Sequence, residues 1–294
     1  MNKLVHRVAA GGVLLLGLLT LPGSVAGQVL PTPKAFVSNL DVRCYKIPDQ
    51  PPLGVGLRLD HLNPYFVSKG LPFEQVVLQE PQDLCVPVYK EDQVPPPDVL
   101  PFIRFVDWKC YGISGPPLDL PVHLDHLNPV IAKMFGPVDD VIVREPQQLC
   151  VPVAKNNTFP PPAVMNLVSW LDVKCYRVDS DRHLGGEPIL LTHLNPLFAG
   201  LPPEVVKFVG PAPNQLCVPV AKNLSFPPPA VRQHIAYSDV LCYDIDGLPL
   251  NQQLILTHLN PVLRNMGLPP ENVWVTDTHK LCVPVAKNGF FPPG

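Results

Sequence analysis

The sequence has few charged residues, and neither sign of charge is concentrated in one segment. Asp, Glu, Lys and Arg together make up 16% of its 294 residues. Removal of an N-terminal signal that carries Lys3 and Arg7 leaves 20 basic residues against 25 acidic ones, a formal charge near −5. Nucleic-acid phosphates attract clustered basic residues, and no such cluster occurs here. Nucleic acid is therefore not an expected partner.

The chain also lacks an apolar run long enough to cross a membrane. The run from Val8 to Leu21 has 14 residues, whereas a spanning helix needs roughly 20. Basic residues precede this run and the small residues Ser24-Val25-Ala26 follow it, which predicts a secretory signal peptide over residues 1–26. No cysteine follows the run to accept a lipid. We therefore expect a secreted or cell-surface protein, without a lipid anchor and without a membrane span once the signal is removed.

Signatures of catalysis are absent as well. The chain has no G-x-S-x-G nucleophile motif and no glycine-rich phosphate loop. Glu80 and Glu145 stand in similar Glu-Pro segments but have no counterparts later in the chain, so a paired-carboxylate mechanism has no repeated support. The sequence predicts no catalytic residue and no cofactor, and we do not expect an enzyme. A secreted enzyme with one unrepeated site between repeat units stays open as an alternative.

What the chain does contain is one unit in four copies. Each copy opens on a Cys-Tyr pair and closes on Leu-Cys-Val-Pro-Val, and the opening cysteines are 66, 65 and 67 residues apart. A period of this length indicates tandem small domains and not a solenoid of short repeats. The predicted units cover residues 38–94, 104–159, 169–226 and 236–291.

The unit boundaries and internal patterns predict a mainly β fold, with four small disulfide-stapled domains that each hold one short helix. Alternating apolar residues mark the first and last runs of every unit as strands. The proline two residues after each closing cysteine cannot donate to a sheet, so this strand is expected at a sheet edge or the proline at a bulge. Proline triplets between units favour semi-rigid polyproline spacers, with the preceding residue docked on the unit before. The linkers therefore predict an elongated string of four domains.

All eight cysteines are expected to form disulfides, because export places them in an oxidising compartment. Pairing across the linkers would leave Cys44 and Cys282 at opposite ends of such a string, so pairing within units is predicted. The four predicted disulfides are Cys44 with Cys85, Cys110 with Cys150, Cys175 with Cys217, and Cys242 with Cys282.

A His-Leu-Asn-Pro motif occurs once in every unit. Asparagine is a preferred N-cap and proline fits the first helical position, so the motif predicts the start of a short helix. The histidine is interpreted as structural, because no recurrent Asp, Glu or second histidine stands beside it to complete a metal site. The structural residues of the four motifs are His61 and Asn63, His126 and Asn128, His193 and Asn195, and His258 and Asn260.

The frame of Cys-Tyr followed by Leu-Cys-x-Pro-Val-x-Lys-Asn resembles a repeat of unknown function found in exported bacterial proteins. Asn156, Asn223 and Asn288 match its last position, where the first unit has Glu91. The resemblance implies an extracytoplasmic compartment and a disulfide pattern, but no chemistry. We expect an exported structural or interaction protein whose partner is a surface glycan or protein. A multivalent carbohydrate- or protein-binding array, similar to a lectin, is an alternative, because four weak sites on one chain gain avidity.

Overall fold

The computed structural model describes residues 29–210 and 212–294. The predicted signal peptide lies outside the described residues. The expected fold class is confirmed, since the chain is mainly β and is organised as four disulfide-stapled repeat units. The arrangement of these units differs from the predicted string, because strands from different units pair with one another throughout.

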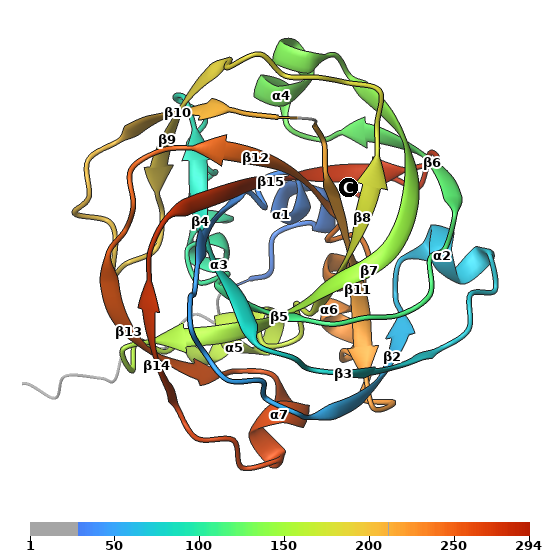
Figure 1. Cartoon of the computed structure of the whole chain (residues 1–294), viewed down its shortest axis with the longest axis vertical. Helices are drawn as coiled ribbons and strands as arrows, with labels where there is room; N and C mark the ends of the chain where they lie inside the picture. Colours follow the sequence, from blue (N-terminus) through green and yellow to red (C-terminus); the bar gives the residue numbers. More distant parts are fainter. Residues whose placement is uncertain (1–28, 211) are drawn as a thin grey trace, which may run out of the picture.

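Eight strands, two from each unit, form a closed antiparallel ring, which we call the central ring (Figure 1). Each first strand pairs with the last strand of its own unit and with the last strand of the preceding unit. Pairing of β1 with β15 joins the fourth unit to the first and closes the ring. The first strands are β1 (Val42–Lys46), β5 (Trp108–Gly112), β8 (Val173–Asp179) and β12 (Val240–Asp246). The last strands are β4 (Pro81–Lys90), β7 (Val138–Lys155), β11 (Gln215–Lys222) and β15 (Thr278–Lys287).

An outer hairpin from each unit packs outside the central ring. Its first strand pairs with the last strand of the unit two places further on, so that His61 lies opposite Val220 and His193 opposite Val88. Every unit is therefore tied to its neighbours through the ring and to its opposite unit through a hairpin. The hairpin strands are β2 (Gly56–His61), β3 (Glu74–Val77), β6 (Leu120–His126) with the first half of β7, β9 (Pro188–His193), β10 (Glu204–Phe208), β13 (Gln252–His258) and β14 (Glu271–Val275).

The sequence predicts that the last strand of each unit lies at a sheet edge or that its proline forms a bulge. The sheet-edge position is wrong, because each last strand has neighbours on both sides. β4 pairs with β5 as far as Cys85 and with the outer strand β9 from Val88 onward. Pro87 stands between these two pairings, and its carbonyl accepts a hydrogen bond from Leu194 N at 3.0 Å. A residue without an N–H fits here because the strand exchanges partners at this point.

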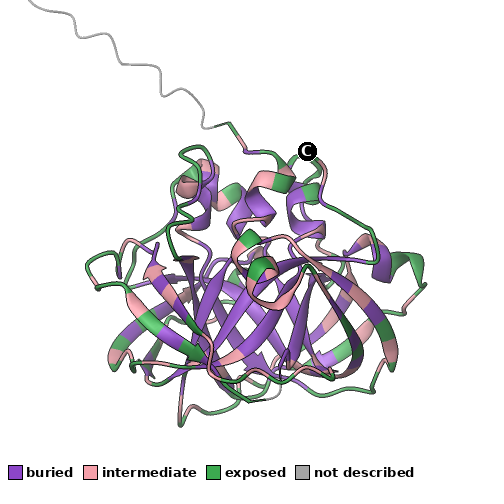
Figure 2. Cartoon of the chain, turned by 90° about the horizontal axis from the view of Figure 1, so that it is seen from above, coloured by how far each residue is buried: buried purple, intermediate pink, exposed green. Residues whose placement is uncertain are grey.

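The proline linkers lead into short helices that cover one end of the central ring (Figure 2). Val94, Phe159 and Phe226 are exposed, so the prediction that they dock was wrong, and the first proline of each triplet is buried in their place. The last described segment has the same pattern, since Pro292 is buried after the exposed Phe291, and Lys34 N in the first linker helix donates to Pro293 O at 2.9 Å. The linker helices are α1 (Pro33–Val37), α3 (Leu100–Ile103), α5 (Pro162–Val168) and α6 (Pro229–Ala236).

The helices predicted after the His-Leu-Asn-Pro motif are present in three units. Asparagine accepts hydrogen bonds from the first-turn N–H groups in α2 (Pro64–Ser68), α4 (Pro129–Phe135) and α7 (Pro261–Asn265). In the third unit the segment after Asn195 forms only a turn. That segment reaches its glycine after four residues, whereas the corresponding segments of the other units have six or seven.

The interior of the central ring holds the four disulfides. Cys44–Cys85, Cys110–Cys150, Cys175–Cys217 and Cys242–Cys282 are all present, with pairing within units. Neighbouring disulfides are in contact, as Cys150 Sγ lies 3.7 Å from Cys175 Sγ. Val42, Trp108 and residues of the linker helices complete this core, while separate apolar clusters lie between the ring and the outer hairpins.

Candidate functional site

The recurrent aspartate and lysine of each unit form a buried ion pair at the helix-covered end of the ring. Lys222 binds Asp172, and both side chains are almost completely inaccessible to solvent. Burial raises the pKa of Asp172 to about 6, although Lys222 and Asn260 act in the opposite direction. The other three pairs are Lys90 with Asp41, Lys155 with Asp107, and Lys287 with Asp239.

The motif asparagine serves two units at once. Asn195 Oδ1 accepts the N–H of Leu197 at 3.0 Å within its own unit, while its Nδ2 donates to Asp107 Oδ2 of the preceding unit at 2.7 Å. Asn63 of the first unit donates to Asp239 of the fourth, which completes the circle. The remaining two bonds are those of Asn128 to Asp41 and Asn260 to Asp172. The asparagine therefore caps the motif helix in units one, two and four, makes the equivalent bond within the turn of unit three, and links neighbouring units in all four.

The motif histidine lies in a second buried cluster that joins opposite units. In one cluster, Tyr111 Oη lies 3.1 Å from His258 Nε2 and donates to Glu271 Oε1 at 2.8 Å, while Lys109 Nζ binds Glu271 Oε2 at 2.5 Å. His258 and Glu271 come from the fourth unit, and Tyr111 and Lys109 come from the second. Two equivalent groups are His61, Glu74, Tyr176 and Lys174, and His193, Glu204, Tyr45 and Arg43. The fourth group holds His126, Asp139 and Tyr243, but Leu241 stands where the others have a basic residue, and Arg182 of unit three pairs with Asp139 in its place.

The carboxylate of these clusters corrects the sequence-based statement that no acidic residue recurs with the histidine. It follows the histidine by 13 residues in units one, two and four, and by 11 in unit three. The repeat is not visible in an ungapped comparison of the units, because the spacing differs in unit three and the residue changes from Glu to Asp in unit two. An alignment of the units that allows a gap in this loop would have revealed it. The four residues are Glu74, Asp139, Glu204 and Glu271.

Electrostatics in these clusters favour fixed structural roles. Burial, together with nearby Arg43 and Lys155, lowers the pKa of His193 to about 3, so this imidazole is neutral at physiological pH. Burial alone would raise the pKa of Glu271, but His258, Lys109 and Tyr111 outweigh it and lower the pKa to about 2. Each cluster thus joins a hairpin to the ring through the histidine Nε2, the tyrosine hydroxyl and, in most clusters, the carboxylate, while the histidine Nδ1 is buried without a partner among the described residues.

A different set of side chains surrounds a cavity of about 940 Å³ at the other end of the central ring, which we call the mouth pocket. First strands run from the linker helices towards this end, and residues that follow their Cys-Tyr pairs, such as Lys46, Arg177 and Asp244, line the pocket. The starts of the last strands supply Gln82, Gln147, Asn214 and His279. All four units contribute to this single cavity.

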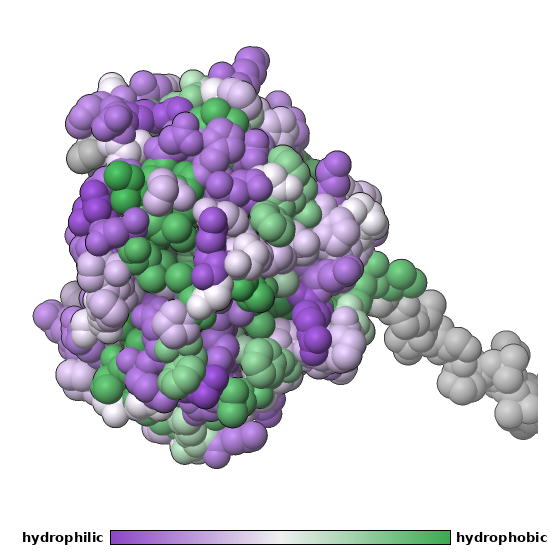
Figure 3. All heavy atoms as spheres, turned by 90° about the vertical axis from the view of Figure 1, so that its right-hand side faces the viewer, coloured by the Kyte–Doolittle hydropathy of each residue, from purple (hydrophilic) through white to green (hydrophobic). Residues whose placement is uncertain are grey.

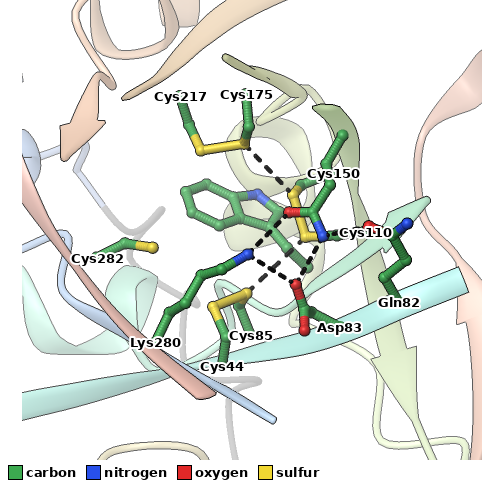
Figure 4. Close-up of a disulfide and its surroundings, with 12 residues drawn as sticks. Cys44, Gln82, Asp83, Cys85, Cys110, Cys150, Cys175, Cys217, Lys280 and Cys282 are labelled. Atoms are coloured by element: carbon green, nitrogen blue, oxygen red, sulfur yellow. Dashed lines mark hydrogen bonds and ion pairs between the residues drawn. A yellow bond between two sulfur atoms is a disulfide. The ribbon is translucent and has the colours of Figure 1, made fainter. Parts of the chain in front are cut away.

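The floor of the mouth pocket is a polar layer directly beside the disulfides (Figure 4). Each unit contributes to this floor the residue two positions before its closing cysteine, which gives Asp83, Gln148, Gln215 and Lys280. Lys280 Nζ contacts Asp83 Oδ2 at 3.2 Å and the Oε1 atoms of Gln148 and Gln215 at 3.4 Å. Gln148 Nε2 donates to Asp83 Oδ2 at 2.7 Å. Lys280, His279 and Gln148 hold the pKa of Asp83 below its usual range, against the effect of burial, so the floor contains an ion pair at neutral pH.

Equivalent positions around the mouth pocket carry different residues in different units. The residue two positions before the closing cysteine is Asp in unit one, Gln in units two and three, and Lys in unit four. The residue three positions before it is Gln in units one and two, Asn in unit three and His in unit four. His279 is the most distinctive of these, with Nδ1 2.9 Å from Asp83 Oδ1 and Nε2 4.0 Å from Asp244 Oδ1. The residue after the Cys-Tyr pair also differs, and in unit two it is Gly112. A side chain at this position would clash with Gln82, because an added Cβ would lie 2.8 Å from Gln82 Nε2. The fourfold ring thus encloses an asymmetric pocket.

A smaller hollow of about 600 Å³ lies on the outer hairpins, lined mainly by residues of unit two such as His123 and Asp140, with residues of the other three units beside them. Figure 3 shows the side that carries α2 and β2, where apolar and hydrophilic residues are interspersed. Exposed apolar side chains on the hairpins, such as Val77, Val205 and Trp274, point outward from strands. Single exposed residues of this kind are ordinary on a protein surface.

Within residues 29–210 and 212–294, no group of three or more His, Cys, Asp and Glu side chains is arranged to hold a metal ion. No helix in the described part of the chain is long and apolar enough to cross a bilayer. The four disulfides indicate an oxidising compartment. Comparisons with protein-family models, with curated proteins and with solved structures found no match.

Proposed function

We propose that the protein is an exported binding protein that holds one small polar ligand in the mouth pocket. The observation that carries this proposal is the asymmetry of the pocket within a fourfold framework. Framework positions repeat the same residue in all units, whereas the positions around the pocket differ from unit to unit. A ring needs no such difference to close, but recognition of an asymmetric ligand does. The volume also lies in the range of small-molecule sites.

The architecture favours one site over the four-site array considered from the sequence. The recurrent residues are buried in contacts between units, and the hairpins of opposite units interlock. The units therefore do not present four separated surfaces on flexible joints, which avidity requires. Export is supported by the signal-like N-terminal sequence and by the disulfides.

A second candidate, a secreted enzyme acting in the same pocket, rests on His279. Asp83 orients its imidazole through Nδ1, as a carboxylate does for a general base, and Nε2 lies in the pocket wall. The two candidates differ in what happens to the ligand. A compound that is bound and recovered unchanged supports the binding protein. Conversion by the native protein, lost in His279→Gln, would support the enzyme.

The test is a screen of small polar compounds by thermal unfolding, followed by mapping of each hit with amide NMR. A ligand at 100 times its Kd should stabilise the folded state by about 2.7 kcal/mol, which raises Tm by several degrees in a chain of this size. Bound ligand should shift the side-chain amide signals of Gln82, Gln147 and Gln148. Hits that shift only outer-hairpin signals, or a broad polar screen without any hit, would overturn the proposal.

A further inference from the structure

We infer that the ligand of the mouth pocket is an uncharged, hydroxyl-rich molecule of the sugar or polyol class. This inference rests on the proposed function, because it names the ligand of the same site. Three features of the pocket wall carry it: its carboxamides, its balance of charge and its unpaired acceptors.

Carboxamides are the most frequent polar groups around the pocket. Each carries two N–H donors and a carbonyl acceptor on one rigid plane, so it can donate to one hydroxyl and accept from another. Gln147 shows this clearly, because its Oε1 accepts from Gln215 Nε2 at 3.0 Å while its own amide N–H groups have no acceptor within the described residues. The lining carboxamides are Gln50, Gln82, Gln147, Gln148, Asn214 and Gln215.

The charged side chains around the pocket are either paired or exposed. Lys280 and His279 both contact Asp83 on the floor and wall, and Arg177 is paired with Glu145 and Asp179 outside the lining. Asp244 lies 4.0 Å from His279. The lining residues without an ion pair among the described residues are exposed to solvent, which screens their charge; they are Lys46, Asp49, Glu80 and Asp277. A phosphate or carboxylate ligand usually requires a concentration of unpaired cations, and an ammonium ligand requires unpaired anions. Within the described part of the chain, the pocket has no concentration of buried, unpaired charge of either sign. A neutral ligand avoids the cost of placing another charge in this partly enclosed site.

Two acceptors in the wall remain without a hydrogen-bond partner among the described residues. Asn214 Oδ1 and Asp244 Oδ1 are both buried atoms of pocket-lining side chains. Backbone bonds fix their strands, since Asn214 N donates to Cys242 O at 3.1 Å. A ligand hydroxyl is a small donor that can satisfy such an atom. Ile47, Ile113 and Pro146 add aliphatic surface of the kind that packs against the C–H face of a sugar ring.

The test compares neutral compounds with charged relatives of the same shape. Hexoses, disaccharides and linear polyols are each titrated calorimetrically into the purified chain beside their phosphate esters and amino derivatives. We expect at least one neutral compound to bind at least tenfold more tightly than both of its charged derivatives. Its binding should shift the side-chain amide signals of Gln82 and Gln147.

A matched pair of variants locates the site. Gln147→Glu keeps the acceptor for Gln215 but removes the amide donors, so it should weaken binding of the neutral compound about tenfold. Gln253→Glu makes the same change at an exposed position of β13 and should leave binding unchanged. Unchanged thermal unfolding of both variants establishes that they are folded.

The failure modes of the two proposals differ. If a charged derivative, an amino acid or a nucleotide binds more tightly and Gln147→Glu weakens it, the ligand class is wrong but the mouth site stands. If no neutral compound binds at 100 mM or below, the class is also overturned. If neutral compounds bind and neither Gln147→Glu nor the amide signals respond, the mouth site and with it the proposed function are wrong.

Discussion

The two ends of the central ring are built from the same four units but use them in opposite ways. At the helix-covered end, Asp, Lys and Asn repeat in every unit and bind one another in buried contacts. At the mouth, equivalent positions carry Asp, Gln, Gln and Lys on the floor. Repetition thus marks the residues that hold the helix-covered end together, and we propose that the varied residues at the mouth serve a ligand. In a protein made of repeats, the positions that break the pattern are the better guide to function.

The largest effect should follow from breaking a buried pair at the helix-covered end. Asp172→Ala leaves the Lys222 ammonium buried without its partner, which should cost about 3–5 kcal/mol of unfolding free energy in urea denaturation. The double variant Asp172→Leu, Lys222→Met removes both charges and should be more stable than the single variant. A cost below about 1 kcal/mol for Asp172→Ala would show that the pair is not the support proposed here.

Acid should next weaken the clusters that join opposite units. The pKa of Glu271 is lowered from 4.5 to about 2 in the folded chain, so its contribution is fully present above pH 4.5 and is lost as pH falls towards 2. A shift of this size corresponds to about 3 kcal/mol. Glu271→Gln should reduce the slope of stability against pH in this window, and Tyr111→Phe, which removes only one of its partners, should reduce it less. An unchanged slope in Glu271→Gln would contradict the role of the cluster.

A smaller effect is expected for the motif asparagine. Asn195→Ala removes the bond from Leu197 N that holds the turn and the bond to the buried Asp107, so it should cost about 2 kcal/mol, about 1 kcal/mol for each bond. Asn195→Asp keeps the oxygen that accepts from Leu197 N but loses the donor and faces Asp107 with a second carboxylate. Chemical denaturation should find this variant at least as unstable as Asn195→Ala. Native stability in Asn195→Asp would mean that the contact between units contributes nothing.

The smallest effect should come from an exposed side chain at the mouth, where no buried ion pair is broken. Lys46 lines the pocket with an exposed side chain that makes no ion pair among the described residues. Lys46→Ala should therefore change the free energy of unfolding by no more than about 0.5 kcal/mol. The same denaturation series serves as the measurement. A loss comparable to that of Asp172→Ala would erase the distinction between a supporting end and a binding end.

Much of each unit could be predicted from the sequence, because local chemistry decides it. Asn63 before a proline starts a helix, and period-two alternation places Cys44 inside the ring and Tyr45 outside it. The relation between units was not predictable in this way, because strand pairing between residues about 160 positions apart leaves no local pattern. Cys44 and Cys282 were assumed to lie at opposite ends, whereas Val42 pairs with Cys282 in the ring. The mouth pocket was missed for the same reason, since it exists only once all four units meet.

The central claim is that the four units form one closed ring and not a string of domains, and small-angle X-ray scattering tests it most directly. For residues 27–294, which remain if the predicted signal peptide is removed, a compact fold predicts a radius of gyration of about 18 Å and a pair-distance distribution with one peak and no long tail. Separate domains held apart by proline spacers would give a clearly larger radius and an extended tail, and that result would contradict the ring and the single pocket within it.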